Sequence, residues 1–149
     1  MENDRSYAWV VELPISVPVA VERATEALSE QGFGVLTRID AHEVLKKRIG
    51  IDRAPYVILG ACNPTFAHQA IEAEPAVGIL LPCNVVVEAV AEAKGGGCRV
   101  WVTRPDALLA ITGRSDIAPL AAEVGRRLAA VVSALQSGMQ SATNEGVKS

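Results

Sequence analysis

Apolar and polar positions follow two different periods along this chain, and the change from one to the other marks the predicted elements. Alternation with a period of two, or a short run that is apolar throughout, predicts a strand, whereas apolar residues three and four positions apart predict a helix. The strand pattern covers residues 7–13, 33–39, 56–62, 77–81, 85–94 and 98–103. The helical pattern covers residues 18–31, 40–49, 63–73 and 115–137, with a shorter turn at 105–111.

Two of the predicted strands, residues 56–62 and 77–81, are apolar on both faces, as strands covered on both sides are. The segment between them predicts a helix that begins at Asn63-Pro64, because asparagine caps free amides and proline fits the first helical turn. A strand, a helix and a second strand indicate a βαβ unit with parallel strands. We therefore expect an α+β fold with a mixed, largely antiparallel sheet of about six strands and helices packed on it, containing one βαβ unit.

Length and composition set limits on this fold. The chain has 149 residues, of which 50% are hydrophobic and 4% aromatic, so we expect one core of Val, Ile, Leu and Ala. We predict a single domain over residues 1–137 and a disordered tail of small and polar residues over 138–149. The net charge of −3 and the dispersed basic residues argue against binding to nucleic acid or to an anionic membrane. No export signal or membrane-spanning run is recognised, and a cytoplasmic location is expected.

The candidate chemistry of the chain lies in its cysteines. In a reducing cytoplasm the three cysteines are not expected to form a structural disulfide framework. Cys62 and Cys83 end the two strands of the predicted βαβ unit, so both thiols should lie on one edge of the sheet, where open α/β sheets tend to bind ligands. If the two strands are neighbours, their axes lie about 5 Å apart and the sulfurs can share a ligand or a disulfide. A strand between them would separate the sulfurs by about 10 Å.

Each of these cysteines is followed by an asparagine, which gives a first functional interpretation. Cys62 precedes the positive end of a helix, a placement that favours the thiolate, and Cys83 is its partner in redox or sulfur chemistry or in binding a soft metal or cofactor. Asn63, Pro64 and Asn84 are then the candidate ligand-binding residues, at a helix start suited to a small anion or a carbonyl oxygen. Neither the cofactor nor the metal is identified by these residues, and whether the chain is an enzyme stays open.

A second interpretation treats both cysteines as small buried hydrophobes and both asparagines as cap and turn residues. The protein is then a non-enzymatic dimeric module that encloses a small ligand, or a purely structural domain. The other candidates are weaker: His42 and His68 are expected to be exposed, and Cys98 is expected to fill the core. His68 points away from the apolar face of its predicted helix, which consists of Phe66, Ala67, Ala70 and Ile71.

Three stretches, residues 32–40, 58–64 and 72–87, occur in an order that resembles domain-of-unknown-function family 302. The two Cys-Asn pairs lie within these stretches, and the resemblance covers residues 7–135. It implies a two-layer α+β fold that is usually found as a homodimer, and it supplies no established activity and no catalytic residue. From it we expect the chain to have itself as a partner. The candidate site residues add a small molecule or anion as a further expected partner.

Overall fold

A computed structural model describes the backbone of residues 4–148 and the side chains of residues 4–138. Within these residues, five strands form a single sheet in the spatial order β1-β5-β4-β3-β2, and every neighbouring pair is antiparallel. The strands are β1 (Ala8–Leu13), β2 (Gly34–Asp40), β3 (Tyr56–Cys62), β4 (Cys83–Ala89) and β5 (Cys98–Thr103).

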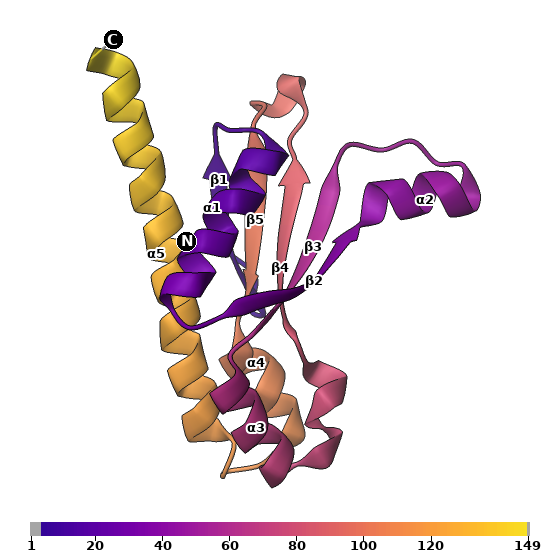
Figure 1. The fold of residues 1–149 in the computed structure, drawn as a ribbon, viewed down its shortest axis with the longest axis vertical. Helices are drawn as coiled ribbons and strands as arrows, with labels where there is room; N and C mark the ends of the chain where they lie inside the picture. Colours follow the sequence, from indigo (N-terminus) through magenta and orange to yellow (C-terminus); the bar gives the residue numbers. More distant parts are fainter. Residues whose placement is uncertain (1–3, 149) are drawn as a thin grey trace.

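The helices of the described chain are distributed unevenly around the sheet. α1 and α5 pack against one face, α3 and α4 gather beyond one end of the strands, and α2 stands away from the body (Figure 1). None of these helices is both long enough and apolar enough to cross a membrane. The α-helices are α1 (Val17–Glu30), α2 (Ala41–Ile49), α3 (Pro64–Ala73), α4 (Pro105–Leu109) and α5 (Ala118–Lys148), and the 3-10 helices are η1 (Pro75–Leu80), η2 (Glu92–Lys94) and η3 (Ala110–Thr112).

Alternate strand positions build the covered face of the sheet. Because successive side chains point to opposite faces, the period-two pattern delivers one row of valines and leucines per strand to the side of α1 and α5. These rows are at most 1% exposed in the three central strands, and Leu28 of α1 and Leu128 of α5 are fully buried against them. The rows consist of Val57, Leu59 and Ala61 in β3, Val85 and Val87 in β4, and Cys98, Val100 and Val102 in β5.

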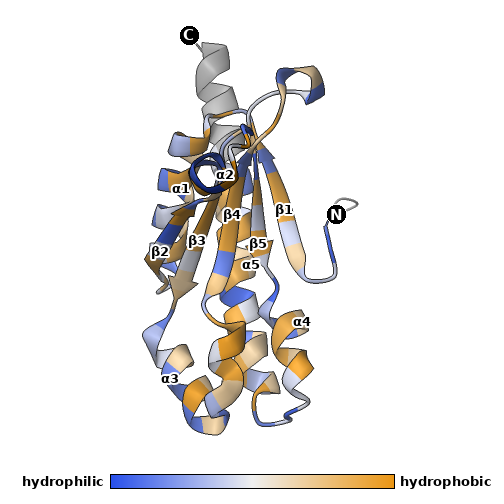
Figure 2. Cartoon of the chain, turned by 90° about the vertical axis from the view of Figure 1, so that its right-hand side faces the viewer, coloured by the Kyte–Doolittle hydropathy of each residue, from blue (hydrophilic) through white to orange (hydrophobic). Residues whose placement is uncertain are grey.

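Among the described residues, no comparable cover lies over most of the other face of the sheet. Figure 2 shows α2 in front of the upper end of this face and α5 behind the sheet. Tyr56, Val86 and Trp101 are half-buried there. The Trp101 indole N–H donates to the Glu88 carboxylate over 2.9 Å, and the Arg99 guanidinium lies 5.8 Å from the Trp101 ring centroid. The fold is therefore a two-layer arrangement, with one apolar face covered by helices and one mixed face open.

The predicted sheet was wrong in two respects. Residues 77–81 form no strand, because 75–80 are the 3-10 helix η1, and no βαβ unit forms because β3 and β4 are antiparallel. A short apolar run fits either a strand or a helix, and here helical spacing prevails. Val77 is 1% exposed whereas Ile79 is 87% exposed, and the Glu74 carboxylate caps η1 by accepting from Ala76 N over 3.2 Å.

Two smaller differences concern the later part of the chain. The strand predicted for residues 85–94 ends at Ala89, and η2 with three glycines of positive φ leads into β5. β4 and β5 nevertheless pair as antiparallel neighbours in the sheet. The predicted disorder of residues 138–149 falls on a segment whose side chains lie almost wholly outside the described residues, so it stays a prediction.

Candidate functional site

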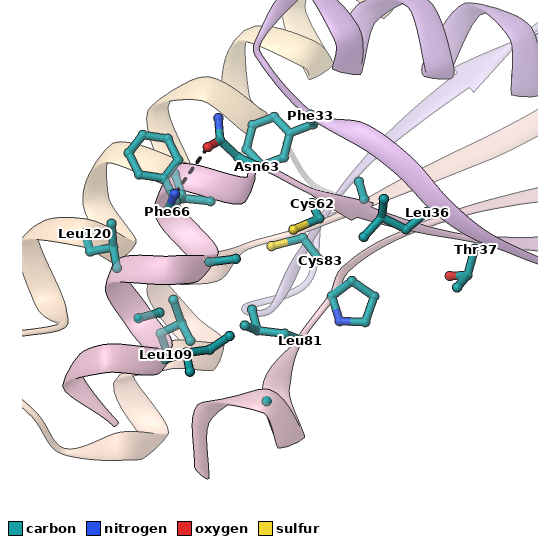
Figure 3. A pocket seen from close by; sticks show the side chains of 17 residues that line it. Phe33, Leu36, Thr37, Cys62, Asn63, Phe66, Leu81, Cys83, Leu109 and Leu120 are labelled. Carbon is teal, nitrogen blue, oxygen red and sulfur yellow. Dashed lines mark hydrogen bonds between the residues drawn. The ribbon is translucent and has the colours of Figure 1, made fainter. Parts of the chain in front are cut away.

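The buried residues of the described chain form two clusters, and a cavity lies where they meet. The larger cluster fills the space between the sheet, α1 and α5, and the smaller one joins α3, η1, α4 and the start of α5. A partly open cavity of about 340 Å³ is lined by Phe33, Ala61 and Val124 of the larger cluster and by Ala70 and Leu109 of the smaller one. The site therefore lies at the seam between the sheet and the group of helices beyond its end (Figure 3).

Helix α3 supplies one wall of this cavity. The predicted apolar face of the helix is confirmed, because all four of its residues line the cavity, whereas His68 is exposed. The helix begins where Asn63 Oδ1 accepts a hydrogen bond from the Phe66 amide over 3.2 Å, with Pro64 in the first turn (Figure 3). Arg127 of α5 lies behind the wall, 5.0 Å from the Phe66 ring centroid, and donates to Gln31 O over 3.2 Å.

A β-bulge in β2 shapes the opposite wall. The register passes from Val35 opposite Ala61 to Thr37 opposite Gly60, so Leu36 is an extra residue without a partner. A bulge turns the side chains that follow it, and both Leu36 and Thr37 line the cavity. Gly60 permits this approach: a Cβ at that position would lie 2.2 Å from Thr37 Oγ1.

Cys62 and Cys83 both line the cavity, and the prediction that they share one edge of the sheet is confirmed for a different reason than the one proposed. Cys62 ends β3 and Cys83 begins β4, and antiparallel neighbours bring the end of one strand beside the start of the next. Ala61 is the residue directly opposite Cys83. The two sulfurs lie side by side at the end of these strands (Figure 3), close enough for Cys62 to perturb the Cys83 thiol.

Electrostatically, the cavity is neutral. Burial, and then the neighbouring Cys62, raise the pKa of the Cys83 thiol to about 11, so this thiol keeps its proton at neutral pH. Among the described residues that line the cavity, none is Asp, Glu, His, Lys or Arg. The polar groups in its wall are two thiols, the Thr37 hydroxyl and the Asn63 side chain. This arrangement suits an uncharged, largely apolar molecule better than an anion.

The remaining predicted ligand-binding residues lie elsewhere. Asn84 is exposed and lines a groove on the open face of the sheet beside Glu88 and Trp101, and Pro64 is exposed outside the cavity wall. The structure thus brings Cys62, Cys83 and Asn63 together and leaves Asn84 and Pro64 apart from them. At the helix start expected to suit a small anion, the Phe66 amide already donates to Asn63 Oδ1.

Two other candidates are structural in this fold. Cys98 is 1% exposed in the larger cluster, as expected for a residue that fills the core, and burial raises its pKa to about 11. His42 was expected to be exposed, which is wrong: it is half-buried, and its Nδ1 accepts from the Tyr56 amide over 3.0 Å. His42 therefore fastens the start of α2 to β3.

No group of three or more His, Cys, Asp or Glu side chains that could hold a metal ion occurs in the part of the chain with described side chains. Cys62 and Cys83 supply two thiol ligands, whereas structural zinc sites use four ligands. Apart from Cys62, Asn63 and Cys83, sequence reasoning missed the cavity residues outside α3, because they come from segments far apart in the chain. The missed lining residues include Phe33, Leu36, Thr37, Leu81, Leu109, Leu120 and Val124.

Comparisons with known proteins agree on one family. The family described as "Domain of unknown function DUF302" matches residues 9–135. The crystal structure of an uncharacterized conserved protein DUF302 from Bacillus stearothermophilus is similar, with a TM-score of 0.78 and 27% sequence identity, over 88% of this chain and 99% of that chain. Among curated proteins, no match was found.

Proposed function

This chain belongs to the family Domain of unknown function DUF302, and we propose that it is a binding module for a small, uncharged, largely apolar molecule held at the seam between sheet and helices. The observation that carries the proposal is the cavity of about 340 Å³ with an apolar, uncharged wall. Small-molecule sites are typically apolar clefts of about 300–1,000 Å³ with a few polar groups that fix orientation. Thr37, Asn63 and the two thiols are the polar groups here.

The energetics of this site favour an apolar ligand. Ligand surface buried against the wall contributes roughly 25 cal/mol per Å². A charged ligand would lose its hydration with no opposite charge among the lining residues of the described chain, which costs several kcal/mol. Phe66 and Phe33 provide aromatic surface beside the start of α3 (Figure 3). An uncharged compound of a few fused or linked rings matches this wall.

A thiol enzyme is less well supported by the same geometry. Nucleophilic catalysis needs a thiolate and a nearby base that activates it. The Cys83 thiol is protonated at neutral pH because burial raises its pKa to about 11, and the lining residues of the described chain include no His, Asp, Glu or Lys. The thiols are therefore better placed as parts of a binding wall than as catalytic groups.

Substitutions in α3 test the binding module with N-phenyl-1-naphthylamine, a neutral apolar dye that fluoresces when it leaves water. The wild-type chain should bind the dye in titrations, and Ala67→Leu should weaken binding about tenfold or more because Ala67 lines the cavity. His68→Leu is the matched control, since His68 is the next residue of the same helix and is exposed. Equal dye binding by both variants, or no binding by the wild type, would contradict the proposal.

The homodimer expected from the family resemblance is part of this proposal. The open face of the sheet exposes part of Tyr56, Val86 and Trp101, and α2 has no buried residue although it carries Val44 and Ile49, which are 47% and 65% exposed. A second copy related by a two-fold axis would cover both surfaces at once, each α2 lying over the open face of the other copy. Glu12 and Glu88 on the open face are both ion-paired with Arg99, so exposed apolar surface rather than charge supports this arrangement.

Light scattering coupled to size exclusion tests the dimer. The measured molar mass of the wild-type protein should be twice that of one chain. The Ile49→Glu and Val86→Glu variants should have the molar mass of a single chain. Ile111→Glu is the control, because Ile111 is 72% exposed and follows α4, beyond the opposite end of the sheet from α2. A wild-type monomer would overturn the dimer without affecting the cavity proposal, which is tested by the dye.

A further inference from the structure

The register of β3 and β4 places Cys62 and Cys83 at a separation that a disulfide can span. Ala61 lies opposite Cys83, so Cys62 is one residue beyond the paired position. Opposed Cα atoms lie about 4.5–5.5 Å apart and one residue adds about 3.4 Å along a strand, which puts the two Cα atoms about 5.6–6.5 Å apart. Disulfides join Cα atoms roughly 4.4–6.8 Å apart. The backbone of the two strands therefore needs little movement for this bond.

The side chains also face the same space. Neighbouring residues of a regular strand point to opposite faces, but Cys62 is the last residue of β3, where the chain turns through Asn63 into α3. Both cysteines line the cavity, and their sulfurs lie side by side in Figure 3. The influence of Cys62 on the pKa of Cys83 agrees with this proximity. Cys98, by contrast, is enclosed in the larger cluster on β5 and does not line the cavity.

We propose that Cys62 and Cys83 form a reversible disulfide, made by a hydroperoxide and broken by a dithiol, that weakens ligand binding at the cavity they line. The binding half of this inference rests on the proposed function, whereas the formation of the disulfide does not. The pair would then act as a redox-sensitive element in the wall of the binding site.

The chemistry requires two steps and one hydroperoxide. The Cys62 sulfur attacks one oxygen of hydrogen peroxide and the O–O bond breaks, giving Cys62 sulfenic acid and one water. The Cys83 sulfur then attacks the Cys62 sulfur, and the hydroxyl group leaves with the Cys83 proton as a second water. Two thiols together lose two electrons, and the peroxide gains them. Cys62 is oxidised first because burial keeps the Cys83 thiol protonated at neutral pH.

The bond would change the cavity because of what adjoins each cysteine. Cys62 precedes the Asn63 cap of α3, and Cys83 follows Pro82, so the small shift that closes the bond is passed on to the helix wall and to the Leu81-Pro82 wall. A bound ligand lies against both thiols and opposes that movement. Linkage makes the effect reciprocal: oxidation weakens binding by the same factor by which ligand disfavours oxidation. A factor of about five or more is expected for coupling through a shared wall.

Mass spectrometry of the full chain tests the bond directly. The sequence has no Lys or Arg between Ala54 and Ala93, so trypsin leaves both cysteines in one peptide, residues 54–94. Peroxide treatment should lower this peptide by the mass of two hydrogens and reduce the free thiols from three to one, and dithiothreitol should reverse both changes. Cys98→Ser is the matched control, and the number of free thiols in this variant should fall from two to none after peroxide treatment. Cys62→Ser should form no disulfide with Cys83.

Binding of N-phenyl-1-naphthylamine to the reduced and oxidised wild-type chain tests the coupling. Oxidation should weaken dye binding about fivefold or more, with recovery on reduction, and saturating dye should slow the loss of thiols. Unchanged thiols after peroxide, a peptide 54–94 linked to a second copy of itself, or equal dye affinity in both states would each overturn the inference. If the reduced chain binds no dye, the proposed function fails, and the peptide mass still decides whether the disulfide forms.

Discussion

The Thr37 hydroxyl occupies the space beside Gly60 on the neighbouring strand. A Cβ at residue 60 would lie 2.2 Å from Thr37 Oγ1 and 2.8 Å from Pro82 Cγ, distances that side chains do not tolerate. The absence of a side chain at residue 60 therefore lets β2 and Pro82 close over β3 two residues before Cys62. This relation between Thr37 and Gly60 links the packing of the sheet to the shape of the cavity.

Gly60→Ala should destabilise the fold by about 1–3 kcal/mol, because the new methyl group forces Thr37 and Pro82 apart. Chemical denaturation measures the loss. The matched control is Gly34→Ala in β2, where a Cβ meets nothing within 4 Å, and it should be close to neutral. Thr37→Ala removes the nearer obstacle, so the double variant should recover part of the loss. Additive effects of the two substitutions would show that the contact does not limit residue 60.

Asn63→Ala should lower stability by about 1 kcal/mol, because it removes the hydrogen bond from the Phe66 amide that caps α3. The expected fall in Tm is about 2–4 °C for a chain of this size. Asn63→Asp keeps an oxygen acceptor at the cap and should restore most of the loss. If Asp behaves like Ala in thermal melts, capping is not the main role of this side chain.

Replacing a buried leucine and replacing an exposed leucine of the cavity wall should have opposite effects on stability and on dye binding. Leu128→Ala should cost about 2–5 kcal/mol, because Leu128 is fully buried between α5 and the sheet. Leu36→Ala should change stability by less than about 0.5 kcal/mol, since Leu36 is 68% exposed at the bulge, but it should weaken dye binding because Leu36 lines the cavity. Urea unfolding and dye titration of the two variants separate the core from the site.

Alkaline pH should destabilise the fold through its buried thiols. A thiol with a higher pKa in the folded chain holds its proton more tightly there, so this contribution to stability is complete below pH 9 and is lost as the pH rises toward 11. Burial raises the pKa of Cys83 and of Cys98 from 9.0 to about 11, which corresponds to about 2–3 kcal/mol for each thiol.

The change of stability between pH 8 and pH 11 is the quantity to compare, because other groups also titrate in this range. Cys83→Ala and Cys98→Ala should each show a smaller fall than the wild-type chain, whatever their stability at pH 8. A fall that is equal in all three proteins would assign the alkaline transition to groups other than these thiols.

Local pattern predicted the elements that depend on near neighbours. Short windows of the sequence are enough to predict the apolar face of α3, its Asn63 cap and the buried row of β4. These features depend only on helical or strand periodicity and on capping. The strand prediction for residues 77–81 was wrong, because a run of five apolar residues fits the strand period and the helical period equally well. Their helical state in η1 depends on Val77 packing into the smaller cluster, a contact with residues about 30 to 45 positions away.

The sequence by itself determined the α+β class, the family and the nearness of Cys62 and Cys83 to the end of one sheet. Only the tertiary structure decided that β3 and β4 are antiparallel neighbours, that Asn84 points to the other face, and that Leu36, Leu109 and Leu120 complete a cavity around the thiols. The physical reason is that period and capping are local, whereas a cavity forms where segments distant in sequence pack and leave space between them.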